Sequence, residues 1–126
     1  MIRLAIVLVA VLTSGLPANC EIATAQAEGA LLRSLDKVSG AITDQTLLQN
    51  AKINVGNLEV TLSECRYPVD NPVGDAFARM TIHSDKVVTP IFQGWMVASS
   101  PALSSLDHAR YDVWVLRCVT SRGETE

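Results

Sequence analysis

The chain contains repeated stretches in which apolar and polar residues alternate, a pattern typical of a β-strand with one buried face. The clearest example covers residues 51–66, where two alternating runs are joined by Gly56 and Asn57. Such a pair predicts a β-hairpin, because the tight turn between the two strands needs a positive φ. The alternation breaks at Glu64 and Cys65, which predicts a β-bulge or a change of buried face at that point.

The same alternation predicts further strands at residues 37–44, 76–83, 87–97 and 111–119. Pro90 interrupts the third of these segments, which favours a position at a sheet edge or a bulge. The last segment is apolar on both faces and is therefore predicted to be a central strand. Residues 28–35 give a weaker signal, compatible with an entering strand or with a frayed helical turn.

One segment, residues 99–107, is predicted to be helical. Ser100 is a suitable N-cap and Pro101 suits the first helical position, while Leu103 and Leu106 would share one face. Residues 67–75 contain two prolines, a glycine and three Asp or Asn residues, and predict a loop. The pattern therefore predicts an all-β domain, built as a small antiparallel sandwich or a partly open barrel with one short helix.

The candidate core is the stretch from Phe92 to Cys118, which contains four of the six aromatic residues. Aromatic side chains bury the most area per residue, so residues 92–97 and 111–115 are expected to supply the core, with Trp114 inside it. Trp95 is expected in the core as well. If Trp95 were instead exposed beside Phe92 and Met96, these side chains would form an apolar site for a partner.

The N-terminus has the pattern of a secretory signal peptide, with a positive charge at Arg3, an apolar run at residues 4–12 and an Ala-Gln-Ala sequence ending at Ala27. We expect cleavage after Ala27, which makes residues 1–27 the signal peptide. A single domain at residues 28–120 and a disordered tail at residues 121–126 would follow. The apolar run is shorter than the roughly 20 residues that cross a membrane, so no membrane span is expected in the mature chain.

Cleavage after Ala27 leaves two cysteines, Cys65 and Cys118. An even number of cysteines in an exported protein predicts a disulfide, because disulfides form and persist in oxidising compartments such as the periplasm. The alternative to a soluble periplasmic product is a lipoprotein processed at Cys20. The net charge of −3 offers no polybasic surface, so binding to nucleic acid is not expected.

No catalytic or metal-binding constellation is predicted. The serine-rich segment near His108 and Asp112 lacks the G-x-S-x-G turn that activates a nucleophilic serine. Its serines are explained as helix caps or solvated surface, and His108 as the residue that ends the helix. His83 and Asp85, with Asp107 and His108, do not supply the four ligands of a structural zinc site. We therefore expect a protein that is not an enzyme and that holds no metal or cofactor.

Charged side chains surround the loop at residues 67–75. They form either a solvated loop with surface ion pairs or a recognition loop held by a rigid scaffold. Together with the aromatic stretch they give the candidate binding residues, which are Phe92, Trp95, Met96, Arg66, Asp70 and Asp75.

Several sequence blocks resemble a known bacterial family. The blocks LDKVSG, LEVTLSECRYP, GWMVASSPALSSLDH and YDVWVLRC are similar, in this order, to those of the Gram-negative family catalogued as domain of unknown function 2155. The resemblance covers residues 32–118, implies an exported protein and brings no catalytic residues with it. It also implies that Cys65 and Cys118 are the cysteine pair of that family.

Two functions from different classes are compatible with the sequence. The first is a periplasmic, non-enzymatic module that binds an envelope partner, either a protein or a complex at the inner membrane. The second is a β-domain that binds a small molecule or a glycan in an aromatic pocket around Trp95. An open apolar patch would favour the first function, and an apolar pocket with few polar groups would favour the second.

Overall fold

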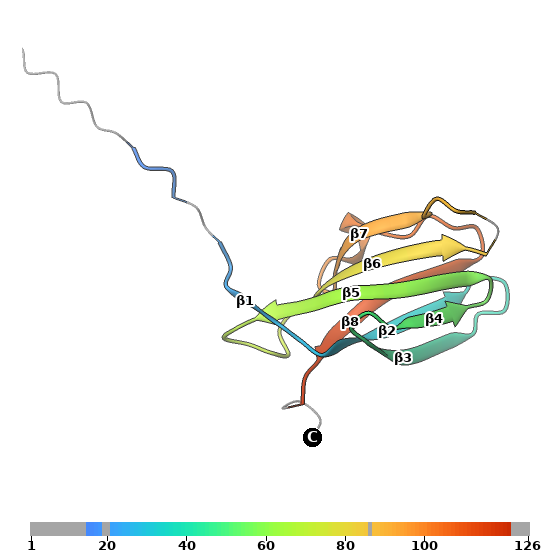
Figure 1. The fold of residues 1–126 in the computed structure, drawn as a ribbon, viewed down its shortest axis with the longest axis horizontal. Helices are drawn as coiled ribbons and strands as arrows, with labels where there is room; N and C mark the ends of the chain where they lie inside the picture. The colour runs from blue at the N-terminus through green and yellow to red at the C-terminus, as the bar shows by residue number, and fades with distance from the viewer. Residues whose placement is uncertain (1–14, 19–20, 86, 122–126) are drawn as a thin grey trace, which may run out of the picture.

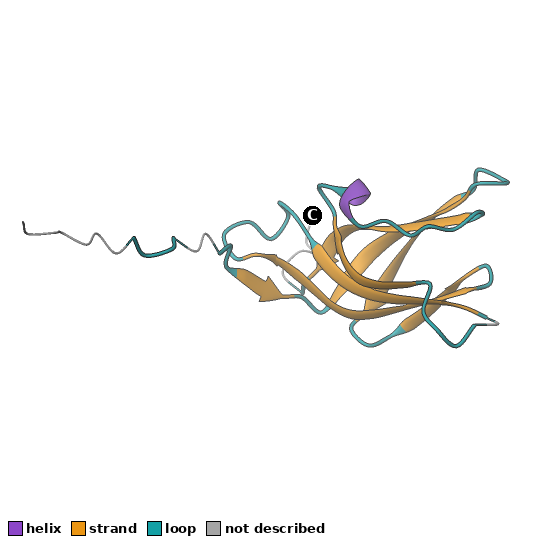
Figure 2. Ribbon diagram, turned by 90° about the horizontal axis from the view of Figure 1, so that it is seen from above, coloured by secondary structure: helices purple, strands orange, loops and turns teal. Residues whose placement is uncertain are grey.

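The computed structural model describes residues 15–18, 21–85 and 87–121. Most of the predicted leader (residues 1–14), the alternative processing residue Cys20 and residues 122–126 of the predicted tail lie outside these ranges. The described chain folds into two antiparallel sheets that pack face to face (Figures 1 and 2). Of the two expected architectures, the sandwich is the one that the chain adopts.

The larger sheet has the strand order β1-β5-β6-β7, and β4 also pairs with β5. Its strands are β1 (Thr24–Gln26), β4 (Lys52–Val55), β5 (Leu58–Pro68), β6 (Phe77–Ser84) and β7 (Phe92–Val97). The smaller sheet has the order β3-β2-β8, with β2 (Gly29–Asp36), β3 (Ile42–Leu48) and β8 (Tyr111–Val119). Within the described ranges no helix is long and apolar enough to cross a membrane.

The predicted hairpin and bulge are both confirmed. Val55 pairs with Leu58 across the turn, and Gly56 has the required positive φ of 57°. The register of β5 against β6 shifts between Leu62 and Glu64. This shift allows Cys65 to face the core although it is out of phase with the earlier inward residues of β5.

The core lies between the two sheets and is mainly aliphatic. β5 and β6 form its centre, and their inward side chains are fully buried: Leu58, Val60, Leu62, Cys65, Ala78, Met80 and Ile82. The smaller sheet contributes Ala30, Leu32, Leu47, Val113 and Val115. Residues far apart in the sequence therefore meet in one layer, as expected for a sandwich whose inner faces interdigitate.

The expectation that aromatic residues form the core is wrong. None of the six aromatic side chains is buried, and the predicted core residue Trp114 is only half-buried. From the two expected segments only Met96, Val113 and Val115 enter the core. The physical reason is strand alternation: Val113 and Val115 point inward, so Trp114 between them must point outward.

Three predicted elements differ from the observed ones. Residues 37–44 are not one strand, because a turn containing Gly40 at φ 75° separates β2 from β3. The ambiguous segment before it forms β2, which is the central strand of the smaller sheet. β8 was expected to be central, but it pairs with β2 alone and lies at the sheet edge. The strand expected at residues 87–97 is shorter, because β7 begins only after Pro90. It lies at an edge of the larger sheet, which is the position that Pro90 favours.

The predicted helix at residues 99–107 is reduced to one 3₁₀ turn, Pro101–Leu103. The Ser100 side chain makes no capping hydrogen bond, and the chain becomes extended at Ser104. Leu103 is exposed whereas Leu106 is buried, so the two do not share a face. The short segment is held by Leu106, which reaches the core, rather than by helical hydrogen bonds.

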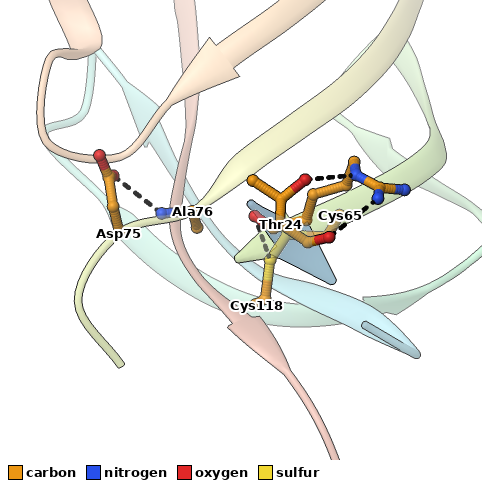
Figure 3. Close-up of a disulfide and its surroundings, with 6 residues drawn as sticks. Thr24, Cys65, Asp75, Ala76 and Cys118 are labelled. Atoms are coloured by element: carbon orange, nitrogen blue, oxygen red, sulfur yellow. Dashed lines mark hydrogen bonds between the residues drawn. A yellow bond between two sulfur atoms is a disulfide. The ribbon is translucent and has the colours of Figure 1, made fainter. Parts of the chain in front are cut away.

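The predicted disulfide is confirmed. It joins Cys65 of β5 to Cys118 of β8, with 5.7 Å between their Cα atoms, and thereby links the two sheets (Figure 3). Both cysteines are buried. A register shift between β2 and β8 next to Leu31 brings Cys118 to the inner face, in the same way that the bulge in β5 does for Cys65.

Candidate functional site

The most unusual surface of the molecule is the outer face of the smaller sheet. Because the inward residues of β2 are Ala30 and Leu32, the residues between and beyond them point to the opposite side. The register aligns Leu35 with Ile42 and Arg33 with both Asp44 and Trp114. We call this surface the Trp114 face; its large apolar side chains are Leu31, Leu35, Ile42, Leu48 and Trp114.

These apolar side chains are in contact with solvent to different extents. Ile42 is 60% exposed and Leu48 is 57% exposed, while the other three are half-buried. The outward residues of a sandwich strand are normally polar. A sheet face that presents five large apolar side chains therefore has the composition of an interaction surface.

An ion pair lies within this apolar surface. Arg33 donates two hydrogen bonds to Asp44, from Nε to Oδ1 at 2.7 Å and from a terminal nitrogen to Oδ2 at 2.8 Å. This bidentate pair lowers the pKa of Asp44 and raises the pKa of Arg33, mainly through the hydrogen bonds themselves. Asp112 and Arg117 of β8 add one charge of each sign to the same face, so its four charges sum to zero.

A groove runs beside this face, between the edges of β7 and β8. It has a volume of about 250 Å³, and its walls include Met96, Val97, Pro101, Val113 and Trp114. Ser104, Ser105 and Asp112 supply its polar groups. Trp114 is the aromatic residue in the wall of this groove.

Trp95 lies on the opposite side of the molecule, on the outer face of the larger sheet. It is 39% exposed and shares a shallow depression of about 240 Å³ with Thr24, Arg66 and Phe77. Arg66 is held there by Thr24, because its Nε donates to Thr24 Oγ1 at 2.8 Å and a terminal nitrogen donates to the Thr24 carbonyl at 3.1 Å. We call the depression formed by these four residues the Trp95 site.

The remaining predicted binding residues do not join Trp95. Met96 is buried and Phe92 packs against the core, because their positions in β7 face inward. Asp75 accepts hydrogen bonds from the backbone N–H groups of Ala76 and Ser99 and from the Ser99 hydroxyl. It therefore links the segment just before β6 to the segment just after β7. Asp70 is exposed in its loop.

His108 has a structural position rather than the predicted role of ending a helix. Its Nδ1 accepts the backbone N–H groups of Arg110 at 3.1 Å and of Tyr111 at 3.0 Å, which shapes the turn into β8. Arg110 pairs with Asp36 at 3.0 Å at one end of the smaller sheet, where β2 ends and β8 begins. In the described part of the chain, no three His, Cys, Asp or Glu side chains are grouped as metal ligands would be.

Comparison with known proteins places this chain in a family. Residues 30–118 match the family described as "Uncharacterized protein conserved in bacteria (DUF2155)". The chain belongs to this family.

The DUF2155 match covers every residue of the Trp114 face and both disulfide cysteines. Among curated proteins, the chain is similar to "Uncharacterized protein RP359" of Rickettsia prowazekii (strain Madrid E), at 31% identity over 88 residues. The aligned region is 68% of this chain and 57% of the relative, so the DUF2155 chain spans little more than half of that protein. No solved structure gives a significant match.

Sequence reasoning missed the Trp114 face. Leu31, Arg33 and Leu35 alternate with the inward residues of β2, and this signal was present in the weakly patterned segment at residues 28–35. It could have been found if that segment had been treated as a strand, because alternate residues then fall on one outer face.

Proposed function

We propose that this DUF2155 protein is an exported, non-enzymatic binding module that docks on an envelope protein through the Trp114 face. The observation that carries the proposal is the apolar outer face of the smaller sheet, with Ile42 and Leu48 more than half exposed. Clusters of this kind on soluble domains are typical of protein interaction sites. Aromatic anchors surrounded by smaller apolar contacts are also the usual centre of binding energy in protein interfaces.

The chemistry of the partner follows from the charges of the face. Arg33 and Asp44 already satisfy each other, and Asp112 and Arg117 balance. A partner therefore gains little by presenting a charged surface, whereas an apolar, uncharged surface would match the exposed side chains. We propose a partner with an aliphatic or aromatic patch on the periplasmic side of the envelope.

Two features support the location in the periplasm. The N-terminal sequence has the charge, apolar run and small residues of a leader. The domain is also stapled by a disulfide between buried cysteines, a bond that is rare in reducing compartments.

The direct test uses a photo-crosslinking amino acid at Ile42 of the full chain, expressed in a Gram-negative host and irradiated in living cells. The matched control carries the same group at Gln93, which is exposed on the outer face of the larger sheet. We expect one envelope protein to be captured from position 42 and not from position 93. The capture should disappear when Leu48→Asp is added, because a carboxylate would then be buried in the interface.

Other occupants of the face would give different products. Adducts of twice the protein mass would identify a second copy of the chain, and lipid adducts would identify a membrane surface; either result would contradict the proposed partner. Capture from position 93 alone would move the interface to the larger sheet.

The second candidate function is recognition of a glycan or small molecule at the Trp95 site. The exposed Trp95 ring beside the anchored Arg66 favours it, because aromatic surfaces with a few fixed polar groups are suited to small ligands. Titration of ligand libraries against Trp95→Ala and Trp114→Ala would distinguish the two. Binding lost only in Trp95→Ala would support this second function.

A further inference from the structure

Strand β1 lies on the wrong side of the predicted cleavage site. The leader pattern places cleavage after Ala27, yet Thr24–Gln26 is paired along its length with Arg66, Tyr67 and Pro68 of β5. The pairing is extended at both ends by backbone hydrogen bonds. The N–H of Val69 donates to the Ala23 carbonyl at 3.1 Å, and the N–H of Ala27 donates to the Cys65 carbonyl at 2.7 Å.

The residues of this segment are also part of the packed domain. Ala27 is 4% exposed and belongs to the core cluster that contains both disulfide cysteines. Figure 3 shows Thr24 beside Cys65 and Cys118, with its oxygen atoms engaged in hydrogen bonds. The small side chain at position 27 is therefore explained by packing, without reference to a protease.

Cleavage after Ala27 would remove several interactions at once. The Cys65 carbonyl would lose its donor, and Arg66 would lose both acceptors on Thr24. The core would lose Ala27. Buried polar groups without partners are costly, so we expect the shortened chain to have a lower free energy of unfolding.

We infer that the leader is removed upstream of Ala23 and that β1 remains in the mature domain. This inference rests on the proposed export. The sequence between Leu12 and Ala23 contains small residues that a signal peptidase accepts, namely Thr13, Ser14, Gly15, Ala18 and Cys20. A leader of 15 to 22 residues lies within the usual range of about 15–30.

The first test is the mass and N-terminal sequence of the protein purified from the periplasm after expression of the full chain. We expect a first residue between positions 16 and 23. A product that starts at Gln26 or Glu28 would overturn the inference while leaving export intact. A product that starts at Met1 would overturn the inference and contradict export as well.

An acylated product starting at Cys20 would support the retention of β1, because that cut is upstream of Ala23. It would also show that the protein is anchored to a membrane and is not a soluble product.

A second test follows single substitutions through processing. Gln26 is exposed, and Gln26→Arg should change the mass of the mature protein by the difference between the two side chains. If the mature mass is unchanged, residue 26 has been removed and the inference is wrong.

Ala25→Arg changes the −3 position of the predicted site, and we expect normal processing of this variant. An accumulated precursor would overturn the inference.

The stability of the mature protein gives an independent measurement. Thr24→Val keeps the shape of the side chain but removes the hydroxyl that accepts from Arg66. We expect the Tm of the purified mature protein to fall by roughly 4–8 °C, the shift for about 1 kcal/mol in a domain of this size. The control Thr81→Val changes an outward threonine of β6 for which the structure shows no side-chain hydrogen bond. Equal Tm values for Thr24→Val and wild type would overturn the inference.

Discussion

The outer faces of the two sheets are built from the same kind of strand but have opposite character. On the larger sheet, the outward positions of β5 and β6 are mostly polar: Glu59, Thr61, Glu64, Arg66, Arg79, Thr81 and His83. Phe77 and Trp95 are large apolar exceptions on this face, and they lie together in the Trp95 site. On the smaller sheet, large apolar side chains occupy the outward positions of all three strands.

This difference shows where the molecule departs from the needs of a stable sandwich. Both sheets contribute inward residues to one core, so the inner faces are explained by folding. The polar outer face of the larger sheet is explained by solubility. The Trp114 face, with Ile42 and Leu48 exposed, is explained by neither, and the proposed docking of a partner rests on it.

The largest expected effect concerns the Cys65–Cys118 disulfide, which links the two sheets. Replacing both cysteines by alanine should lower the free energy of unfolding by up to about 4 kcal/mol, the chain-entropy value for a loop closed over 53 sequence positions. Denaturant unfolding of the double variant measures the loss. A transition midpoint equal to that of wild type would show that packing alone joins the sheets.

A smaller effect is expected from the two tryptophans, which report on the two faces. Trp114→Ala should cost about 1–2 kcal/mol, below the 3–5 kcal/mol of a fully buried residue, because the side chain is half-buried. Trp95→Ala should cost less than about 1 kcal/mol. Thermal unfolding of both variants sharpens the comparison, and a larger loss for Trp95 would reverse it.

The ion pair separates binding from stability. Arg33→Met combined with Asp44→Leu replaces the pair by apolar side chains, so we expect nearly unchanged unfolding but altered partner affinity. Asp44→Asn alone leaves Arg33 without its carboxylate and should weaken docking more than the double change does. Affinities measured for the three proteins in parallel check this order.

The smallest effect is a pH dependence away from both faces. The hydrogen bond from Arg110 and the N–H groups of Val38 and Ser39 lower the pKa of Asp36 from 3.8 to about 2. Because the folded pKa is below the unfolded one, this contribution is fully present above about pH 4–5. It should be lost as the pH falls toward 2. Asp36→Asn should flatten the stability profile in that window only; a change near neutral pH would contradict this assignment.

The parts of the fold that were predictable depend on local signals. The Gly56–Asn57 hairpin, the bulge before Cys65 and the strands β6 and β8 follow from turn chemistry and period-two alternation. The disulfide followed from the cysteine count. Each of these features needs only a short window of sequence or a simple inventory.

The failures share a different cause. β8 is apolar on both faces, and alternation alone cannot decide whether Trp114 or its valine neighbours point inward. That choice depends on β2, with which β8 pairs far away in the sequence. The prediction of a helix at residues 99–107 is wrong because the local helical signals are weak over so short a segment. The burial of Leu106 in the core outweighs them. Of the predicted binding residues, Trp95 and Arg66 come together, but their neighbour Phe77 and the whole Trp114 face were missed.

The charge balance of the Trp114 face has a kinetic consequence. A face whose positive and negative groups cancel produces little field beyond a few ångströms, so it cannot guide a partner through solution. Encounter should then proceed at the rate of unsteered collisions, on the order of 10⁵–10⁶ M⁻¹s⁻¹. That rate should change little between low and high ionic strength, and selectivity among partners would reside in how slowly the correct complex dissociates.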